Sequence, residues 1–143
     1  MNYSILEIAS ILGVKSDGLT NCTIDTLLTD SRSLTYPETS LFFAIRTNSN
    51  DGHRYVNQLY NNGVRNFVVE EMPQAQYSNS TNFIVVENTT TALQDLAAYH
   101  RKRFNIPVIA ITGSRGKTIV KEWLYQILRD KFNIVRSPRS YNS

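Results

Sequence analysis

The residues with the most specific chemical signature are six consecutive ones, which read G-S-R-G-K-T and end at Thr118. Glycines allow a backbone to approach a phosphate closely, and the unpaired N–H groups at a helix N-terminus favour an anion. Lys117 would add a point charge beside terminal phosphates, and the Thr118 hydroxyl would ligate a magnesium ion shared with them. The pattern predicts a phosphate-binding loop formed by Gly113, Ser114, Arg115, Gly116, Lys117 and Thr118.

The match is to a short form of this loop. The common form G-x-x-x-x-G-K-[ST] needs a glycine at position 111, where this chain has Ile111. A pattern as short as G-x-x-G-K-T can also arise in an ordinary turn before a helix, so its meaning depends on the elements around it. Arg115 would either add a second cation near the phosphates or point to solvent.

The flanking residues predict the elements that such a loop requires. Residues 107–112 read P-V-I-A-I-T, an apolar and β-branched run typical of a strand buried on both faces of a parallel sheet. Apolar residues then recur at helical spacing from Ile119 to Ile127, which predicts a helix from about Lys117 to Asp130. The glycines would therefore lie at the N-terminus of that helix.

Length and composition limit the class of protein. The chain has 143 residues, enough for one ordinary domain or for one small domain and part of another. Its fractions of charged (19%) and hydrophobic (41%) residues are typical of a globular protein rather than a disordered one. No apolar stretch reaches the roughly 18 residues of a membrane span, and the N-terminus does not resemble a signal peptide, so we expect a cytoplasmic protein without membrane insertion. The single cysteine, Cys22, cannot form an internal disulfide.

The first 104 residues predict a self-sufficient α/β unit. Strands are expected at residues 21–30, 41–46, 66–70 and 82–87, and helices at 5–12, 53–62 and 89–104. Ser4 is expected to cap the first helix, Gly63 to end the second, and Thr89 to Thr91 to cap the third. Residues 72–81 are polar, contain Pro73, and predict a loop.

A domain boundary is predicted near Phe104. Residues 105–143 contain the strand, loop and helix of the phosphate site and a second expected strand at 133–136. A nucleotide-binding sheet needs several parallel strands with covered faces. We therefore expect this second unit to be incomplete and the sequence to be the front end of a longer protein.

A series of motifs occurs in the order seen in the Mur ligases, the ATP-dependent enzymes that build the cytoplasmic peptidoglycan precursor. These are D-S-R at 30–32, L-F-F-A-I at 41–45, D-G-H at 51–53, Gly63 before F-V-V-E, and T-G-S-R-G-K-T at 112–118. The chain therefore resembles a Mur ligase over nearly its whole length. Residues 112–122 look most like the MurF type, and the pair Lys121-Glu122 favours that type over MurE.

The resemblance implies a Mur-ligase-like N-terminal α/β substrate domain followed by the start of a P-loop ATP-binding domain. Residues 1–104 would bind the UDP-sugar, and residues 105–143 would begin the central domain, with ATP and Mg²⁺ as cofactors. The substrate-binding residues that it implies are Asp30, Ser31, Arg32, Asp51, His53 and Asn142. A hydroxyl and a guanidinium suit a diphosphate or a uracil edge. Residues 30–32 could also be a solvated turn, and His53 could cap its own helix.

The implied reaction joins D-alanyl-D-alanine to UDP-MurNAc-tripeptide. ATP activates the substrate carboxylate as an acyl phosphate, and the amine then attacks it with loss of phosphate. Lys117 is the implied catalytic residue, and Thr118 with magnesium would stabilise the transferring phosphoryl group. Other groups would come from the remaining Mur ligase domains of the parent chain, so we expect this chain alone to be inactive. The region also resembles fusions with an alanine racemase, in which pyridoxal phosphate would be a further cofactor.

Three other interpretations stay open. The first is a MurE-type or other P-loop ligase, such as a folylpolyglutamate synthetase, although folate ligases generally lack the UDP-binding domain. The second is a non-catalytic nucleotide-sugar binding module. The third, a nucleic-acid binder, has weak support, because the net charge of +3 is modest and no basic stripe interleaves with aromatic residues.

Overall fold

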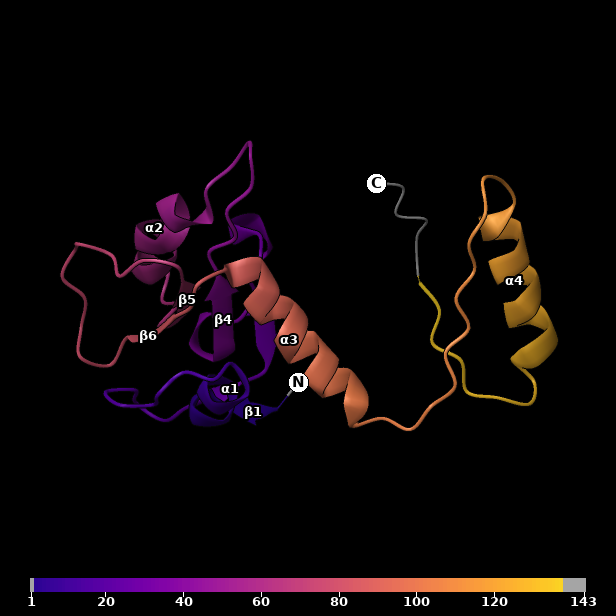
Figure 1. Cartoon of the computed structure of the whole chain (residues 1–143), viewed down its shortest axis with the longest axis horizontal. Coiled ribbons are helices and arrows are strands. Elements are labelled where there is room, and N and C mark those ends of the chain that lie inside the picture. Colours follow the sequence, from indigo (N-terminus) through magenta and orange to yellow (C-terminus); the bar gives the residue numbers. More distant parts are fainter. Residues whose placement is uncertain (1, 138–143) are drawn as a thin grey trace. The chain divides into compact units, whose positions relative to one another are not determined.

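The computed structural model describes residues 2–137 and divides into two compact units, Met1–Phe104 and Asn105–Ser143. A four-stranded parallel sheet forms the centre of the first unit (Figure 1). Its strands are β3 (Thr26–Leu28), β4 (Ser40–Phe43), β5 (Asn66–Val69) and β6 (Asn82–Val85), which lie side by side in that order. Because neighbouring strands are parallel, all of them end at the same edge of the sheet.

Helices cover both faces of this sheet. They are α1 (Ile5–Ile11), α2 (Val56–Asn61) and α3 (Thr89–Lys102). In β4, Leu41 and Phe43 join a core cluster with residues of α1 and α3. Phe42 and the next residue after the strand, Ala44, join a second cluster with residues of α2. All four side chains are buried. The predicted α/β class is therefore confirmed, and the apolar run at 41–45 has the pattern of a strand covered on both sides.

Two predicted helix ends are confirmed. Ser4 caps α1, because its Oγ accepts a hydrogen bond from the Glu7 N–H at 3.0 Å. Gly63 follows α2 with a φ of 98°, a backbone conformation that glycine adopts without a steric penalty.

Several element boundaries differ from the predictions. The strand expected at 21–30 is two short strands, β2 (Thr23–Ile24), which pairs antiparallel with β1 (Tyr3–Ser4), and β3. They are separated at Asp25, whose N–H donates to the Thr39 carbonyl at 3.0 Å. The helix expected at 53–62 begins as a 3₁₀ turn, η3 (Gly52–Tyr55), before α2. The strands expected at 41–46 and 82–87 end earlier, because the chain leaves the sheet there to form loops.

The predicted cap of α3 was wrong. Its N-cap is Asn88, whose Oδ1 accepts from the Thr91 N–H at 2.8 Å. The three threonines instead form the first turn of the helix. Thr89 is fully buried, and its hydroxyl lies 3.2 Å from the Ala44 carbonyl oxygen and 3.1 Å from Glu70 Oε1. The Thr89 hydroxyl therefore bonds residues distant in the sequence instead of capping the helix.

The second unit contains the predicted helix but not the predicted strands. α4 (Lys117–Leu128) begins at the expected residue, whereas residues 107–112 and 133–136 are not strands. A parallel strand needs hydrogen-bonded neighbours and helices over its faces. Within residues 105–137 there is no such sheet, and no residue of α4 is buried: Trp123 is 63% exposed. No helix in the described part of the chain is long and apolar enough to cross a membrane.

Candidate functional site

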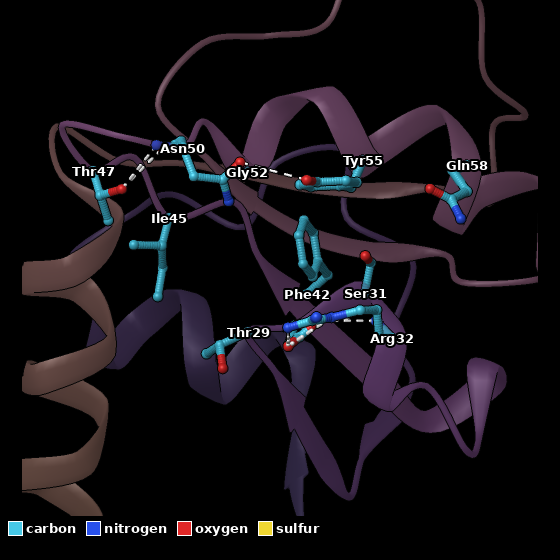
Figure 2. Close-up of a pocket in the computed structure, with 11 residues that line it drawn as sticks. Thr29, Ser31, Arg32, Phe42, Ile45, Thr47, Asn50, Gly52, Tyr55 and Gln58 are labelled. Carbon is cyan, nitrogen blue, oxygen red and sulfur yellow. Dashed lines mark hydrogen bonds and ion pairs between the residues drawn. The ribbon is translucent and has the colours of Figure 1, made fainter. Parts of the chain in front are cut away.

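A pocket of about 660 Å³ lies at the carboxyl edge of the parallel sheet (Figure 2). Open α/β sheets commonly bind ligands outside this edge, and this volume suits a small molecule. The residues that line it are Thr29, Asp30, Ser31, Arg32, Phe42, Ile45, Thr47, Asn50, Gly52, Tyr55 and Gln58. They come from the residues after β3 and the 3₁₀ turn that follows at 31–33, from β4 and the loop after it, and from η3 and α2.

An aspartate and an arginine form a bidentate ion pair at one wall of the pocket. Asp30 caps the 3₁₀ turn η1 (Ser31–Ser33) by accepting from the Arg32 N–H at 3.0 Å. The Arg32 side chain bonds both carboxylate oxygens of Asp30, with Nε at 2.9 Å from Oδ1 and Nη2 at 2.6 Å from Oδ2. The Arg32 side chain is 87% exposed, so Asp30 holds a guanidinium that remains accessible to an anion.

This pairing changes the acidity of Asp30. The hydrogen bonds from the Arg32 side chain, and then that from its backbone N–H, lower the pKa of Asp30 from 3.8 to about 2. Because the pKa of Asp30 is lower in the folded chain, the ion pair stabilises the fold fully at a pH above the unfolded-state pKa of about 4. This stabilisation is lost as the pH falls through about 2. Asp30 is therefore ionised, and able to pair with Arg32, at every physiological pH.

Arg32→Ala is expected to return the pKa of Asp30 most of the way to its ordinary value, since the side-chain bonds are the largest cause of the shift. The ¹³C shift of the Asp30 carboxyl carbon, followed by NMR from pH 2 to 6, measures this directly. Arg54→Ala, which removes an exposed arginine outside the pocket lining, is the matched control and should leave the titration unchanged. A midpoint that stays near 2 in Arg32→Ala would contradict the assigned cause.

A tight loop forms the opposite wall of the pocket. The Gly52 N–H donates to the Ile45 carbonyl at 2.9 Å, and residues 46 and 51 form an antiparallel bridge. Within the loop, the Thr47 N–H donates to the Asn50 carbonyl at 2.8 Å. A Cβ built on Gly52 would lie 2.7 Å from backbone atoms of both Ala44 and Ile45. Only glycine allows the loop to close against the end of β4.

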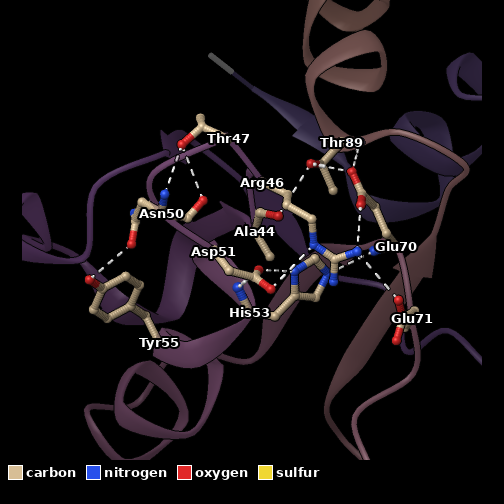
Figure 3. Close-up of polar contacts among 10 residues, drawn as sticks. All are labelled: Ala44, Arg46, Thr47, Asn50, Asp51, His53, Tyr55, Glu70, Glu71 and Thr89. Carbon is tan, nitrogen blue, oxygen red and sulfur yellow. Dashed lines mark hydrogen bonds and ion pairs between the residues drawn. The ribbon is translucent and has the colours of Figure 1, made fainter.

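A polar network lies beside the pocket (Figure 3). Asp51 Oδ1 accepts from the His53 N–H at 3.0 Å and lies 2.7 Å from His53 Nδ1. The His53 backbone N–H is the main cause that lowers the pKa of Asp51. On the other side of the ring, His53 Nε2 accepts from the Glu70 N–H at 3.0 Å. Asp51 and His53 therefore support the loop from outside and are not among the pocket-lining residues.

The phosphate-loop motif has the geometry of a helix N-terminus. Gly116 caps α4 with a φ of 80°, and Gly113 has a φ of 148°, so both occupy conformations that side chains rarely adopt. Lys117 Nζ donates to the Gly113 carbonyl, so the lysine folds back over the loop. Ser114, Arg115 and Thr118 are exposed. The arrangement presents the backbone of residues 113–118 at the positive end of the α4 dipole.

Comparison with known proteins shows which family the chain resembles. No protein-family model matches the chain. It is 37% identical over 120 residues to a UDP-N-acetylmuramoyl-tripeptide--D-alanyl-D-alanine ligase from Synechocystis sp., a match covering 84% of this chain and 26% of that protein. It is similar to the crystal structure of MurF from Acinetobacter baumannii, with a TM-score of 0.79 and 30% identity over 92% of this chain and 28% of that one. The chain is similar in sequence and fold to Mur ligases of the MurF type.

Two further Mur ligases help to define the match. A MurF ligase from Thermotoga maritima, solved in complex with ADP, has a TM-score of 0.67 and 27% identity over 90% of this chain and 28% of its own. A UDP-N-acetylmuramoyl-L-alanyl-D-glutamate--2,6-diaminopimelate ligase from Cytophaga hutchinsonii is 27% identical over 118 residues, 81% of this chain and 24% of that protein. The predicted resemblance to the MurF type is confirmed. The chain spans about a quarter of the length of the curated relatives it matches.

The structure brings together part of the set of residues that the Mur ligase resemblance implied. Asp30, Ser31 and Arg32 line the pocket, whereas Asp51 and His53 lie beside it. Residues 113–118 lie in the second unit. Asn142 lies outside the described residues.

Other pocket residues were missed by sequence reasoning. These are Thr29, Phe42, Ile45, Thr47, Asn50, Gly52, Tyr55 and Gln58. Glu70, at the centre of the polar network, was also missed. Their position along the sequence could have identified several of them. Thr29, Ile45 and Glu70 lie one or two residues after the end of a parallel strand. Ligand sites in such sheets lie at the carboxyl ends of strands, where these residues had to meet.

Proposed function

We propose that residues 1–104 bind the UDP end of UDP-MurNAc-tripeptide and that residues 105–143 begin the ATP-binding domain of a MurF-type ligase. The observation that carries this proposal is the pocket at the carboxyl edge of the sheet, in a chain whose relatives include ligases of that name. The pocket offers an exposed guanidinium, a hydroxyl and aromatic rings, which suit a diphosphate and a base. The setting that we propose is the cytoplasm.

The chemistry that we propose is the ATP-dependent joining of D-alanyl-D-alanine to the tripeptide carboxylate through an acyl phosphate. In a parent chain with the remaining Mur ligase domains, the backbone of residues 113–118 would hold the ATP phosphates. Lys117 would exchange the Gly113 carbonyl for phosphate oxygens and stabilise the charge that develops on the transferring group. Thr118 would ligate Mg²⁺ together with those phosphates.

Calorimetric titration of the chain with UDP-MurNAc-tripeptide, UDP and magnesium-ATP tests the proposal. We expect both UDP compounds to bind, since their site lies wholly in the first unit. Absence of UDP binding with retained ATP binding would contradict the substrate role of residues 1–104. A MurE-type ligase would also bind UDP, but its natural acceptor would carry a dipeptide, so comparison of the dipeptide and tripeptide forms in the parent chain separates the two types.

Ser31→Ala is expected to weaken UDP affinity by about 1 kcal/mol, the net value of one hydrogen bond. The Ser31 hydroxyl has no hydrogen-bond partner within residues 2–137, and in Figure 2 it points toward the space below Tyr55. Ser33→Ala is the matched control, because Ser33 ends the same 3₁₀ turn but does not line the pocket. Equal UDP affinities for the Ser31 and Ser33 variants would show that residues 30–32 form only a structural turn.

A further inference from the structure

The wall of the pocket formed by the loop after β4 is short and exposed to solvent. Thr47 and Asn50 are exposed, and most of the hydrogen bonds of residues 47–50 join Thr47 to Asn50 within the turn that the 46–51 bridge encloses. Outside that turn, Asn50 Oδ1 accepts from the Tyr55 hydroxyl at 3.4 Å. The same loop supplies Thr47, Asn50 and Gly52 to the pocket. An exposed loop of this kind loses conformational entropy when it is ordered, so something outside it must hold it in the ligand-binding shape.

His53 makes contacts that hold the loop in this shape. A backbone N–H can only donate, so the bond from the Glu70 N–H requires His53 Nε2 to carry no proton. The proton of the neutral ring must then be on Nδ1, which lies 2.7 Å from Asp51 Oδ1. The His53 side chain is only 17% exposed. One imidazole therefore joins the last residue of the loop to the carboxyl end of β5.

The network continues from Glu70 in a closed ring. Glu70 Oε2 lies 3.5 Å from Arg46 Nη1, and Arg46 Nε lies 3.2 Å from Asp51 Oδ2. Arg46 and Asp51 are the two ends of the loop, and the coulombic effect of Asp51 is the main cause that raises the pKa of Arg46. Glu70 Oε1 also accepts from the Thr89 N–H at 3.0 Å. The ring thus ties both ends of the loop to β5 and, through Thr89, to the start of α3 (Figure 3).

We propose that His53 is a positioning residue, held in its neutral Nδ1–H form between Asp51 and Glu70, which fixes the 46–51 loop and the adjoining Gly52 as a wall of the nucleotide pocket. It acts through the loop, because both of its ring nitrogens are already bonded within the protein and it does not line the pocket. The inference rests on the proposed function for its ligand, a uridine diphosphate. Its effect on the loop is independent of that ligand.

Only histidine supplies both bonds from opposite sides of one rigid ring. The side-chain amide of asparagine can reproduce the donor to Asp51, and that of glutamine can reproduce the acceptor for the Glu70 N–H. Phenylalanine keeps the ring volume and removes both bonds. The variants His53→Asn, His53→Gln and His53→Phe therefore form a graded series at one position.

The test uses the whole chain with UDP as the probe. We expect His53→Phe to weaken UDP binding by about tenfold, the equivalent of one lost hydrogen bond with its buried partner left unsatisfied. His53→Asn and His53→Gln should fall between His53→Phe and the unchanged chain. Thermal unfolding checks that each variant is folded at the assay temperature, and His100→Phe is the control for loss of the other histidine, which bonds Tyr3 rather than the loop.

Two measurements without ligand separate this inference from the proposed function. Ring ¹⁵N shifts of the unchanged chain should show a protonated Nδ1 and an unprotonated Nε2. Hydrogen exchange of the Gly52 amide, which bonds the Ile45 carbonyl, should be faster in His53→Phe than in the unchanged chain. If the unchanged chain does not bind UDP while exchange is accelerated, the nucleotide assignment fails and the positioning role stands. Unaltered exchange in a folded His53→Phe, or a protonated Nε2, would overturn the positioning role.

Discussion

Lys117→Ala is expected to reduce the turnover number of a full-length ligase containing this segment by an amount equivalent to about 2–4 kcal/mol of transition-state stabilisation. Lys117 begins α4 directly after the left-handed Gly116, which places its ammonium group at the N-terminal end of that helix. The Lys117 ammonium now donates to the Gly113 carbonyl, within the loop that we propose for the phosphates. Its charge would act most strongly when negative charge develops on the transferring phosphoryl group.

Steady-state phosphate release, with both substrates saturating, measures this effect. Lys131→Ala is a suitable control, because Lys131 is an exposed lysine beyond the end of α4. Lys117→Arg keeps the charge but changes its geometry, and we expect it to retain only part of the rate. A turnover number that is the same in Lys117→Ala and Lys131→Ala would refute the catalytic role of Lys117.

Gly52→Ala is expected to lower the free energy of unfolding by about 1–3 kcal/mol, as overpacking of a closed site does. The added Cβ would lie 2.7 Å from the Ala44 carbonyl carbon and the Ile45 nitrogen, which are backbone atoms at the end of β4 and cannot rotate away. Gly52 has no left-handed φ, so the effect is steric and not conformational. To relieve this close contact, the backbone around residue 52 must move. That movement should displace the loop that lines the pocket and weaken UDP binding.

Urea unfolding followed by circular dichroism gives the change in stability, and calorimetry with UDP gives the change in affinity. Gly18→Ala is the control, since a Cβ there meets nothing within 4 Å and the cost is only that of its left-handed backbone. If Gly52→Ala unfolds at the same urea concentration as the unchanged chain and binds UDP equally well, the close approach assigned to Gly52 is wrong.

Local patterns in the sequence predicted the parts of the fold that depend on neighbouring residues. The capping of α1 by Ser4, the end of α2 at Gly63 and the start of α4 at Lys117 were all correct. Each depends on contacts within a few residues, such as a hydroxyl that accepts from an N–H three positions later or a glycine that adopts a left-handed φ. The α/β class of residues 1–104 was also predicted, from apolar strand-like runs that alternate with helical patterns.

Predictions failed where the outcome depends on residues distant in the sequence. Thr89 reads as a helix cap, but Glu70 and Ala44 take its hydroxyl and Asn88 becomes the cap. Residues 107–112 have the composition of a strand, but residues 105–137 provide no sheet for them to join. Strand formation depends on hydrogen bonds to a distant segment, which composition alone cannot supply.

The sequence by itself indicated the resemblance to Mur ligases, predicted a phosphate loop at residues 113–118 and placed residues 30–32 after a strand. The tertiary structure alone decided which side chains share the pocket, because Phe42, Asn50, Tyr55 and Gln58 come together only when parallel strands end at one edge. The tertiary structure also decided which ring nitrogen of His53 carries the proton. A lone histidine in a sequence has two possible neutral forms, and only the backbone N–H of Glu70, 17 residues away and brought close by the sheet, selects one of them.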